Sequence, residues 1–308
     1  MKDISCNLAG LDLANPILTA SGTFGYGLEF EPYGNLSKLG GLVVKGLSLN
    51  PRGGNPTPRI VETACGLLNA IGLQNIGAKS FVRDKLPHLP WRDTQVIANL
   101  YAQSVDEFSE LAEFLAREEG IAALEVNVSC PNVAQAGVGF GQDPQQADAV
   151  CRAVKKVSGL KPVIVKLTPN VTNIREIAAA VQGGGADAIS LINTLSGMAV
   201  DIHTRKPKLA NVQGGLSGPA IKPVALHQVY QVCQEVSIPV IGLGGITSAA
   251  DILEFILVGA HAVQVGSANF LRPDMSFQLV DELQSLTEEL GISSWDEWRG
   301  GLKVDLKP

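Results

Sequence analysis

The sequence is poor in the residues that build disulfide frameworks and metal sites. Its 308 residues include five cysteines and four histidines, and both kinds are scattered along the chain. The cysteines form no C-x-x-C pair, and the histidines form no H-E-x-x-H motif. We therefore expect neither a disulfide framework nor a metal or iron–sulfur site within this chain.

Positive charge and long apolar runs are also scarce. The formal net charge is −6, and no run of basic residues stands out, which argues against a nucleic-acid partner. No segment approaches the ~20 consecutive apolar residues of a membrane span. The first residues lack the apolar stretch of a signal peptide. We expect a cytoplasmic protein that binds neither nucleic acid nor membrane.

Apolar residues and glycine are abundant instead. The sequence is 45% hydrophobic and contains 33 glycines, a composition that suits a large α/β core with many tight turns. Short apolar runs predict strands at Pro16–Ala20, Gly41–Lys45, Gln95–Leu100, Ala122–Val128, Pro162–Leu167, Ala186–Asn193, Ile238–Leu243 and Ala260–Val265. Amphipathic patterns between them predict helices at Ser104–Glu119, Asp143–Ser158, Asn173–Gly183, Pro219–Val236 and Ser248–Val258.

Eight apolar strands separated by helices or long crossovers predict an α/β fold, specifically a (β/α)8 TIM barrel. A doubly wound sheet is the alternative. The barrel is favoured because the strands number eight and polar residues cluster where the strands end. Residues 5–13 are expected to form a short hairpin that seals the bottom of the barrel. Since no internal linker or repeat is visible, residues 1–308 are expected to form one domain with long loops over the carboxyl-terminal mouth.

Polar side chains follow several of these strands. The carboxyl ends of all barrel strands meet at one mouth. Two lysines and three asparagines would converge there, namely Lys45, Lys166, Asn99, Asn127 and Asn193. Burying a lysine without an anionic partner costs free energy. The position of each lysine therefore predicts a fixed positive charge that faces a bound ligand. A solvated lysine at the rim is the alternative for both.

Glycine-rich turns follow the seventh and eighth strands. Barrels commonly bind phosphate at this place, and the N–H groups of Gly244, Gly245, Gly266 and Ser267 are candidates for that role. Ordinary tight-turn geometry is the alternative. The sequence has neither G-x-G-x-x-G nor G-x-x-x-x-G-K-[ST], which argues against a dinucleotide site or a P-loop. A mononucleotide cofactor therefore fits better than NAD or ATP.

The most informative segment runs from Leu124 to Asn132, where a buried strand leads to Asn127 and then to Cys130. The glycines at 137, 139 and 141 suit a loop that opens and closes over a site. Cys130 would face a ligand on such a loop, although a small buried apolar residue is the alternative. Asn69–Asn75, a predicted loop between the second and third strands, offers amide edges suited to a planar ring. Turn chemistry is the alternative there.

Together these motifs resemble those of the class 1 dihydroorotate dehydrogenases, and the likeness covers essentially the whole chain. It rests on the segments Asn127–Asn132, Asn69–Asn75, Ile192–Thr194, Gly242–Gly245, Ala20–Gly25, Gly53–Arg59 and Leu216–Pro223. The resemblance implies an FMN-containing barrel that oxidises dihydroorotate to orotate in pyrimidine synthesis. It also implies that Cys130 is the base that removes the C5 proton.

The resemblance further implies two sets of binding residues. FMN would contact Ser21, Lys45, Gly46, Asn99, Asn127, Lys166, Ile192, Gly218, Gly244, Gly245, Gly266 and Ser267. Substrate would contact Lys45, Asn69, Ala70, Ile71, Gly72, Leu73, Asn127, Asn132, Asn193 and Thr194. Gly46 stands where alanine- or serine-like residues are common in the family, and only a backbone contact is expected there.

In its details the chain looks most like the NAD-linked class 1B catalytic subunit. That likeness implies a partner subunit carrying FAD and a 2Fe–2S iron–sulfur cluster, in a heterotetramer of two catalytic and two partner chains. One alternative is a class 1A enzyme, which uses fumarate, and another is a different flavin-dependent dihydropyrimidine oxidoreductase. A non-catalytic phosphate- or nucleotide-binding barrel is the alternative from outside the enzymes.

Overall fold

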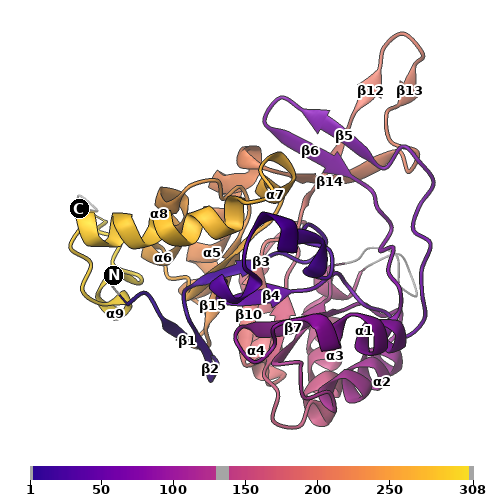
Figure 1. The fold of residues 1–308 in the computed structure, drawn as a ribbon. Coiled ribbons are helices and arrows are strands. Elements are labelled where there is room, and N and C mark those ends of the chain that lie inside the picture. Colours follow the sequence, from indigo (N-terminus) through magenta and orange to yellow (C-terminus); the bar gives the residue numbers. More distant parts are fainter. Residues whose placement is uncertain (1–2, 130–138, 305–308) are drawn as a thin grey trace.

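Eight parallel strands close into a barrel in this structure, a computed structural model that describes residues 3–129 and 139–304 (Figure 1). In the order of their pairing the strands are β10 (Ala188–Leu191), β15 (Val240–Leu243), β16 (Ala262–Val265), β3 (Ile17–Thr19), β4 (Gly41–Val43), β7 (Gln95–Leu100), β8 (Ala123–Asn127) and β9 (Val163–Lys166). Every one of the eight predicted strands is present; Gln95–Leu100 is unchanged, and the others are shorter by one or two residues at one or both ends. The barrel prediction is confirmed, and a doubly wound sheet is excluded.

The barrel strands are buried on both faces, which explains their near-continuous apolar sequences. Side chains such as Leu18, Ile97 and Ile164 fill the interior of the barrel, and alternate residues pack outward against the helices. The interior cluster also includes Leu8 and Leu13 from an antiparallel hairpin of β1 (Cys6–Leu8) and β2 (Leu11–Leu13). This hairpin seals one end of the barrel, as the sequence predicted.

The helices cover the outside of the barrel. They are α1 (Ala78–Asp84), α2 (Val105–Ala116), α3 (Pro144–Val157), α4 (Ile174–Gly183), α5 (Lys222–Cys233), α6 (Ala249–Leu257), α7 (Ala268–Leu271), α8 (Met275–Glu289) and α9 (Trp295–Trp298), with 3-10 helices η1 (Leu28–Tyr33), η2 (Leu36–Lys38), η3 (Leu86–His88), η4 (Phe140–Gln142) and η5 (Pro219–Ile221). Side-chain caps fix several starts, and Ser248 with Asp251 forms a reciprocal capping box on α6. None of the helices in residues 3–129 and 139–304 is long and apolar enough to cross a membrane.

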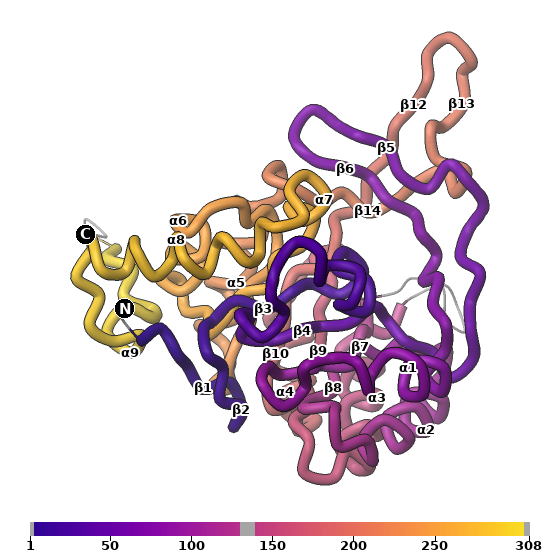
Figure 2. The backbone as a smooth tube through the Cα atoms, viewed as in Figure 1, coloured from indigo at the N-terminus to yellow at the C-terminus, as the bar shows by residue number. Residues whose placement is uncertain are grey.

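A second sheet stands apart from the barrel at the upper right of Figure 1. Its four antiparallel strands pair in the order β11 (Leu195–Met198), β14 (Gln213–Ser217), β6 (Gly66–Asn69) and β5 (Ile60–Thr63), and β12 (Val200–Asp201) pairs with β13 (Lys206–Pro207) in a projecting hairpin. Figure 2 shows β6 beside β14, although about 150 residues separate them. The predicted loop at Asn69–Asn75 needs correction, because Asn69 is the last residue of β6.

Candidate active site

Three neighbouring strands bring Asn99, Asn127 and Lys166 to one end of the barrel. The register of β8 and β9 places Asn127 directly beside Lys166. Asn99, Asn127 and Lys166 are only 1%, 8% and 4% exposed, so none of them is a solvated rim residue. Asn193 joins the group, since its Nδ2 donates to Oδ1 of Asn127 at 3.4 Å. The predicted convergence of amides and lysine is therefore present in the structure.

A carboxylate that the sequence analysis did not single out lies beneath these residues. Glu125 is fully buried on β8, two positions before Asn127, and so points to the same side of the strand. Its Oε2 accepts a hydrogen bond from Nδ2 of Asn99 at 2.6 Å and lies 3.8 Å from Nζ of Lys166. An acidic residue within the apolar run 122–128 was the available signal, because an unpaired buried carboxylate is very costly.

Lys45 follows β4 and is half-buried, and no residue among 3–129 and 139–304 balances its charge. Its backbone N–H donates to the carbonyl of Gly25 at 2.8 Å, which ties it to the turn after β3. Within the described part of the chain, its ammonium has no ion pair or hydrogen bond. Burial lowers the pKa of Lys45 below its ordinary value. An anionic ligand at this point would relieve that cost.

The glycines after β15 meet a glycine that precedes α5. Gly244, Gly245 and Gly218 have φ angles of 125°, 73° and 101°, a region that side-chain-bearing residues avoid. A Cβ on Gly245 would lie 3.0 Å from the carbonyl oxygen of Gly218, and a Cβ on Gly218 would lie 2.6 Å from Cα of Gly66. Turn geometry alone thus requires these glycines. Because these glycines have no side chains of their own to cover the backbone, a phosphate can approach their N–H groups closely.

The remaining predicted FMN contacts lie at neighbouring strand ends. Ser21 follows β3 in a turn closed by Thr23, whose hydroxyl donates to the carbonyl of Ala20 at 3.0 Å. Ile192 follows β10, and its N–H donates to the carbonyl of Leu243 on β15 at 3.2 Å. Gly266 and Ser267 follow β16 and lead directly into the four-residue helix α7. A Cβ on Gly266 would lie 3.6 Å from that of Ala20, so this turn lies against the end of β3.

The second sheet brings predicted substrate residues together from two distant segments. Asn69 donates through Nδ2 to the carbonyl of Gly215 at 3.4 Å, and a Cβ on Gly215 would collide with Oγ1 of Thr194. The segment then continues through Ala70, Ile71, Gly72 and Leu73 toward the barrel mouth. A Cβ on Gly46 would lie 3.9 Å from Cδ2 of Leu73 and 3.0 Å from Oδ1 of Asn99.

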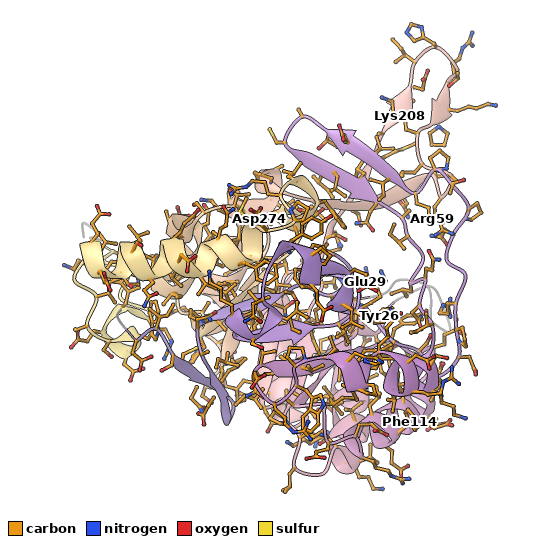
Figure 3. All side chains as sticks on the ribbon, in the orientation of Figure 1. Tyr26, Glu29, Arg59, Phe114, Lys208 and Asp274 are labelled. Atoms are coloured by element: carbon orange, nitrogen blue, oxygen red, sulfur yellow. The ribbon has the colours of Figure 1, made fainter. Side chains whose placement is uncertain are left out.

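Arg59, labelled in Figure 3, braces this segment from outside. Its guanidinium donates through Nη1 to Oε1 of Gln74 at 2.6 Å and through Nη2 to the carbonyl of Gly53 at 3.0 Å. The two bonds hold the chain before β5 against the chain after β6. The 69–73 segment is therefore fixed at both of its ends, by Asn69 in the sheet and by Gln74 against Arg59.

Two predicted residues, Cys130 and Asn132, lie outside the described residues. Three of the other four cysteines contrast with the role predicted for Cys130, and the fourth, Cys65, is exposed. Burial raises the pKa of Cys6, Cys151 and Cys233 to about 12, so these thiols are poor bases at neutral pH. No group of three or more His, Cys, Asp or Glu side chains in residues 3–129 and 139–304 is placed to hold a metal ion.

The mouth fits the FMN that the resemblance implies. Oδ1 of Asn99 is buried without a hydrogen-bond partner in the described part of the chain, which suits a ligand that offers an N–H group. Lys45 and Lys166 provide positive charge, and the turns at Gly218 and Gly244–Gly245 expose backbone. The donors, the acceptors and the cations match a phosphate and a flavin ring in chemical type.

Comparison with known proteins supports the same family. The family model described as dihydroorotate dehydrogenase matches residues 3–287. The chain is 66% identical over 302 residues to a protein of Solidesulfovibrio magneticus named dihydroorotate dehydrogenase B (NAD(+)), catalytic subunit, covering 98% of this chain and 99% of that one. Proteins with the same name from Maridesulfovibrio salexigens and Geotalea uraniireducens are 63% and 56% identical, over 98% and 97% of this chain and 99% and 98% of theirs.

Proposed function

The chain belongs to the dihydroorotate dehydrogenase family, and from this premise we propose that it oxidises (S)-dihydroorotate to orotate in the synthesis of pyrimidine nucleotides. The observation that carries the proposal is the near full-length identity to proteins of that name. The barrel mouth supports it independently, because it combines the Lys45 cation, which has no partner among the residues that the structure describes, with amide groups suited to a pyrimidine ring.

The proposed substrate site is centred on Lys45. The substrate is an anion, and the Lys45 ammonium would bind its carboxylate in a charge-assisted contact. The ring of the substrate has amide-like edges, which pair with the donors and acceptors of asparagine. The proposed contacts of substrate are Lys45, Asn69, Ala70, Ile71, Gly72, Leu73, Asn127, Asn132, Asn193 and Thr194.

The proposed reaction forms a C5=C6 double bond by removing two hydrogens. Cys130 as the thiolate would take the C5 proton and become a thiol, and the C6 hydrogen would leave with its electron pair. When bound, FMN supplies the acceptor for that hydride. The ammonium of Lys166 would balance the negative charge that arrives with the electrons. The proposed contacts of FMN are Ser21, Lys45, Gly46, Asn99, Asn127, Lys166, Ile192, Gly218, Gly244, Gly245, Gly266 and Ser267.

The relatives are named as catalytic subunits of an NAD(+) enzyme, which implies a separate electron-transfer subunit. We propose that this chain passes electrons to such a subunit, and that the subunit carries FAD and a 2Fe–2S iron–sulfur cluster. The proposed assembly has two catalytic and two partner chains and works in the cytoplasm. Residues 1–308 would act in it as a single FMN-binding domain.

The activity can be tested with purified protein and an artificial dye as acceptor. Dihydroorotate should drive dye reduction, with orotate as the product, and the flavin released by denaturation should have the mass of FMN. Recovery of FAD, or dye reduction that yields no orotate, would refute the proposal. Dihydrouracil, which lacks the carboxylate, is the matched control substrate and should react far more slowly. Equal rates with both would favour a different dihydropyrimidine oxidoreductase.

A further inference from the structure

We propose that Glu125 is the positioning residue of the flavin site, and that it acts by orienting the Asn99 amide and retaining the Lys166 ammonium. The inference rests on the proposed function, since it concerns how this chain binds FMN. Glu125 would touch neither FMN nor substrate. It acts from the layer of side chains directly beneath the mouth.

Glu125 is the hub of a polar layer inside the barrel. Besides Asn99, its carboxylate accepts hydrogen bonds at Oε1 from Oγ of Ser190 at 2.8 Å and from Nε2 of Gln264 at 2.6 Å. The residues of the layer come from five of the eight barrel strands, β7, β8, β9, β10 and β16. Four of them are no more than 1% exposed and Lys166 is 4% exposed, so bulk solvent does not reach this layer.

The carboxylate determines which way the Asn99 amide faces. An ionised carboxylate can only accept hydrogen bonds, so Asn99 must turn its nitrogen toward Glu125. That orientation leaves Oδ1 buried on the side of Gly46, with no hydrogen-bond partner among the described residues. An unsatisfied buried acceptor is expensive in free energy. The imide N–H of a flavin ring is a suitable donor to Oδ1 of Asn99. The orientation of the Asn99 amide thus provides an acceptor for the cofactor.

The same carboxylate attracts the Lys166 ammonium by its charge. It does so without occupying the ammonium N–H donors in short hydrogen bonds. Nζ of Lys166 lies 3.8 Å from Oε2 of Glu125 and 3.5 Å from Oε1 of Gln264, at or beyond the limit of a hydrogen bond. Lys155 and Lys222 are bound far more closely, in 2.5 Å contacts with Asp187 and with Asp251. A pair that served stability alone would be expected to close to such distances. The open geometry leaves Lys166 able to donate toward the mouth.

The test measures FMN affinity of the apoprotein in a double-mutant cycle of Glu125→Gln and Asn99→Ala. A glutamine keeps the volume but replaces one acceptor with an NH2 group, so the Asn99 amide loses its fixed orientation. We expect each single variant to weaken FMN binding by about tenfold or more, because each removes the buried acceptor for the flavin imide N–H and leaves a buried polar group unsatisfied. The double variant should be no weaker than the poorer single variant, because both changes remove the same contact.

Thr94→Val is the matched control for simple loss of a buried hydrogen bond. The Thr94 hydroxyl donates to the carbonyl of Leu39 at 2.7 Å just before β7 begins, at the other end of the barrel. This variant should lower the melting temperature but leave FMN affinity within about twofold of wild type. It should also leave the visible spectrum of bound flavin unchanged, whereas Glu125→Gln should shift that spectrum.

The outcomes separate this inference from the proposed function. Wild-type affinity in Glu125→Gln, or independent and multiplicative losses in the double variant, would overturn the inference while the proposed function stands. A wild-type apoprotein that binds no FMN would overturn both. If Glu125→Gln does not fold, Asn99→Asp asks the same question, because a second carboxylate cannot donate to Glu125. That variant should bind FMN weakly at neutral pH and better in acid, and wild-type affinity at neutral pH would overturn the inference.

Discussion

Two lysines at the barrel mouth carry buried charge in different ways. Lys166 is almost fully buried, but the carboxylate of Glu125 lies close enough to balance its charge. Lys45 is half-buried, and no described residue pairs with its ammonium. Removing water from an unpaired charge costs free energy, so the ligand-free protein carries strain at Lys45 that a bound anion would remove. Such a trade of stability for function is common at binding sites.

Replacing Lys45 with methionine should therefore separate stability from binding. The ligand-free Lys45→Met protein is expected to be more stable than wild type by about 1 kcal/mol, because an unpaired buried charge is gone. Orotate should raise the melting temperature of wild type but barely change that of the variant. The KM for dihydroorotate should rise by about tenfold or more. Lys79→Met, at an exposed position on α1, is the control and should change none of these quantities.

At the level of elements, the sequence was most informative where a segment is buried on both faces. The barrel strands could be predicted because each is a short apolar run, as in Val163–Lys166. The second sheet was missed because its strands lack that signal. β6, β11 and β14 each contain glycine, and none of them is a continuous apolar run buried on both faces. The pairing of β6 with β14 joins segments about 150 residues apart, which no local pattern encodes.

The same distinction applies to the candidate site. Asn99, Asn127 and Lys166 could be predicted because they end apolar strands, and barrel geometry collects strand ends. The role of Glu125 could not be predicted, because its hydrogen-bond partners come from strands far apart in the sequence. Helix α8 was also absent from the predicted helices, although Met275, Leu279, Leu283 and Thr287 repeat at the i, i+4 spacing of a buried face.

The β1–β2 hairpin should matter for stability and not for chemistry. Leu8 is fully buried against the barrel interior, so Leu8→Ala should lower the free energy of unfolding by about 2–5 kcal/mol. Urea denaturation measures that loss. Asn7→Ala, at the exposed neighbouring position, is the control and should cost less than half as much. A loss of FMN affinity in folded Leu8→Ala protein would contradict this division of roles.

His261, between α6 and β16, should make stability depend on pH. Burial, aided by the charge of Arg299, lowers the pKa of His261 to about 4, against an ordinary value of about 6.5. Below pH 6.5 the unfolded chain takes up a proton that the folded chain refuses, so stability falls as the pH drops from about 6.5 to about 4. His261→Gln should show a smaller fall in chemical denaturation over that window. His203→Gln, on the exposed β12–β13 hairpin, should behave like wild type.

At the level of the whole molecule, the question is where the electrons go after they reach the barrel. The chain has no dinucleotide-binding motif and no clustered cysteines, which leaves it without an evident NAD or iron–sulfur site of its own. Its relatives are named as catalytic subunits, a name that fits this division of labour. We therefore propose that transfer to NAD⁺ requires a second protein.

The choice of electron acceptor tests that requirement. The purified chain alone should reduce artificial dyes with dihydroorotate but should reduce NAD⁺ at a rate near background. Addition of the electron-transfer subunit should raise NAD⁺ reduction by at least about a hundredfold, and size-exclusion chromatography should show a complex. Rapid turnover with fumarate by this chain alone would instead indicate a class 1A enzyme. That result would overturn the partner subunit while leaving the barrel and the FMN site intact.

Anaerobic mixing of the FMN-loaded chain with dihydroorotate tests the central claim most directly, because it needs neither partner nor final acceptor. Loss of flavin absorbance should accompany formation of orotate in equal amount, and the rate should rise with pH as the Cys130 thiol ionises. Cys130→Ala should keep its FMN but show no bleaching on the same timescale. Unchanged flavin absorbance in the wild-type protein, or bleaching of Cys130→Ala at the wild-type rate, would contradict the account.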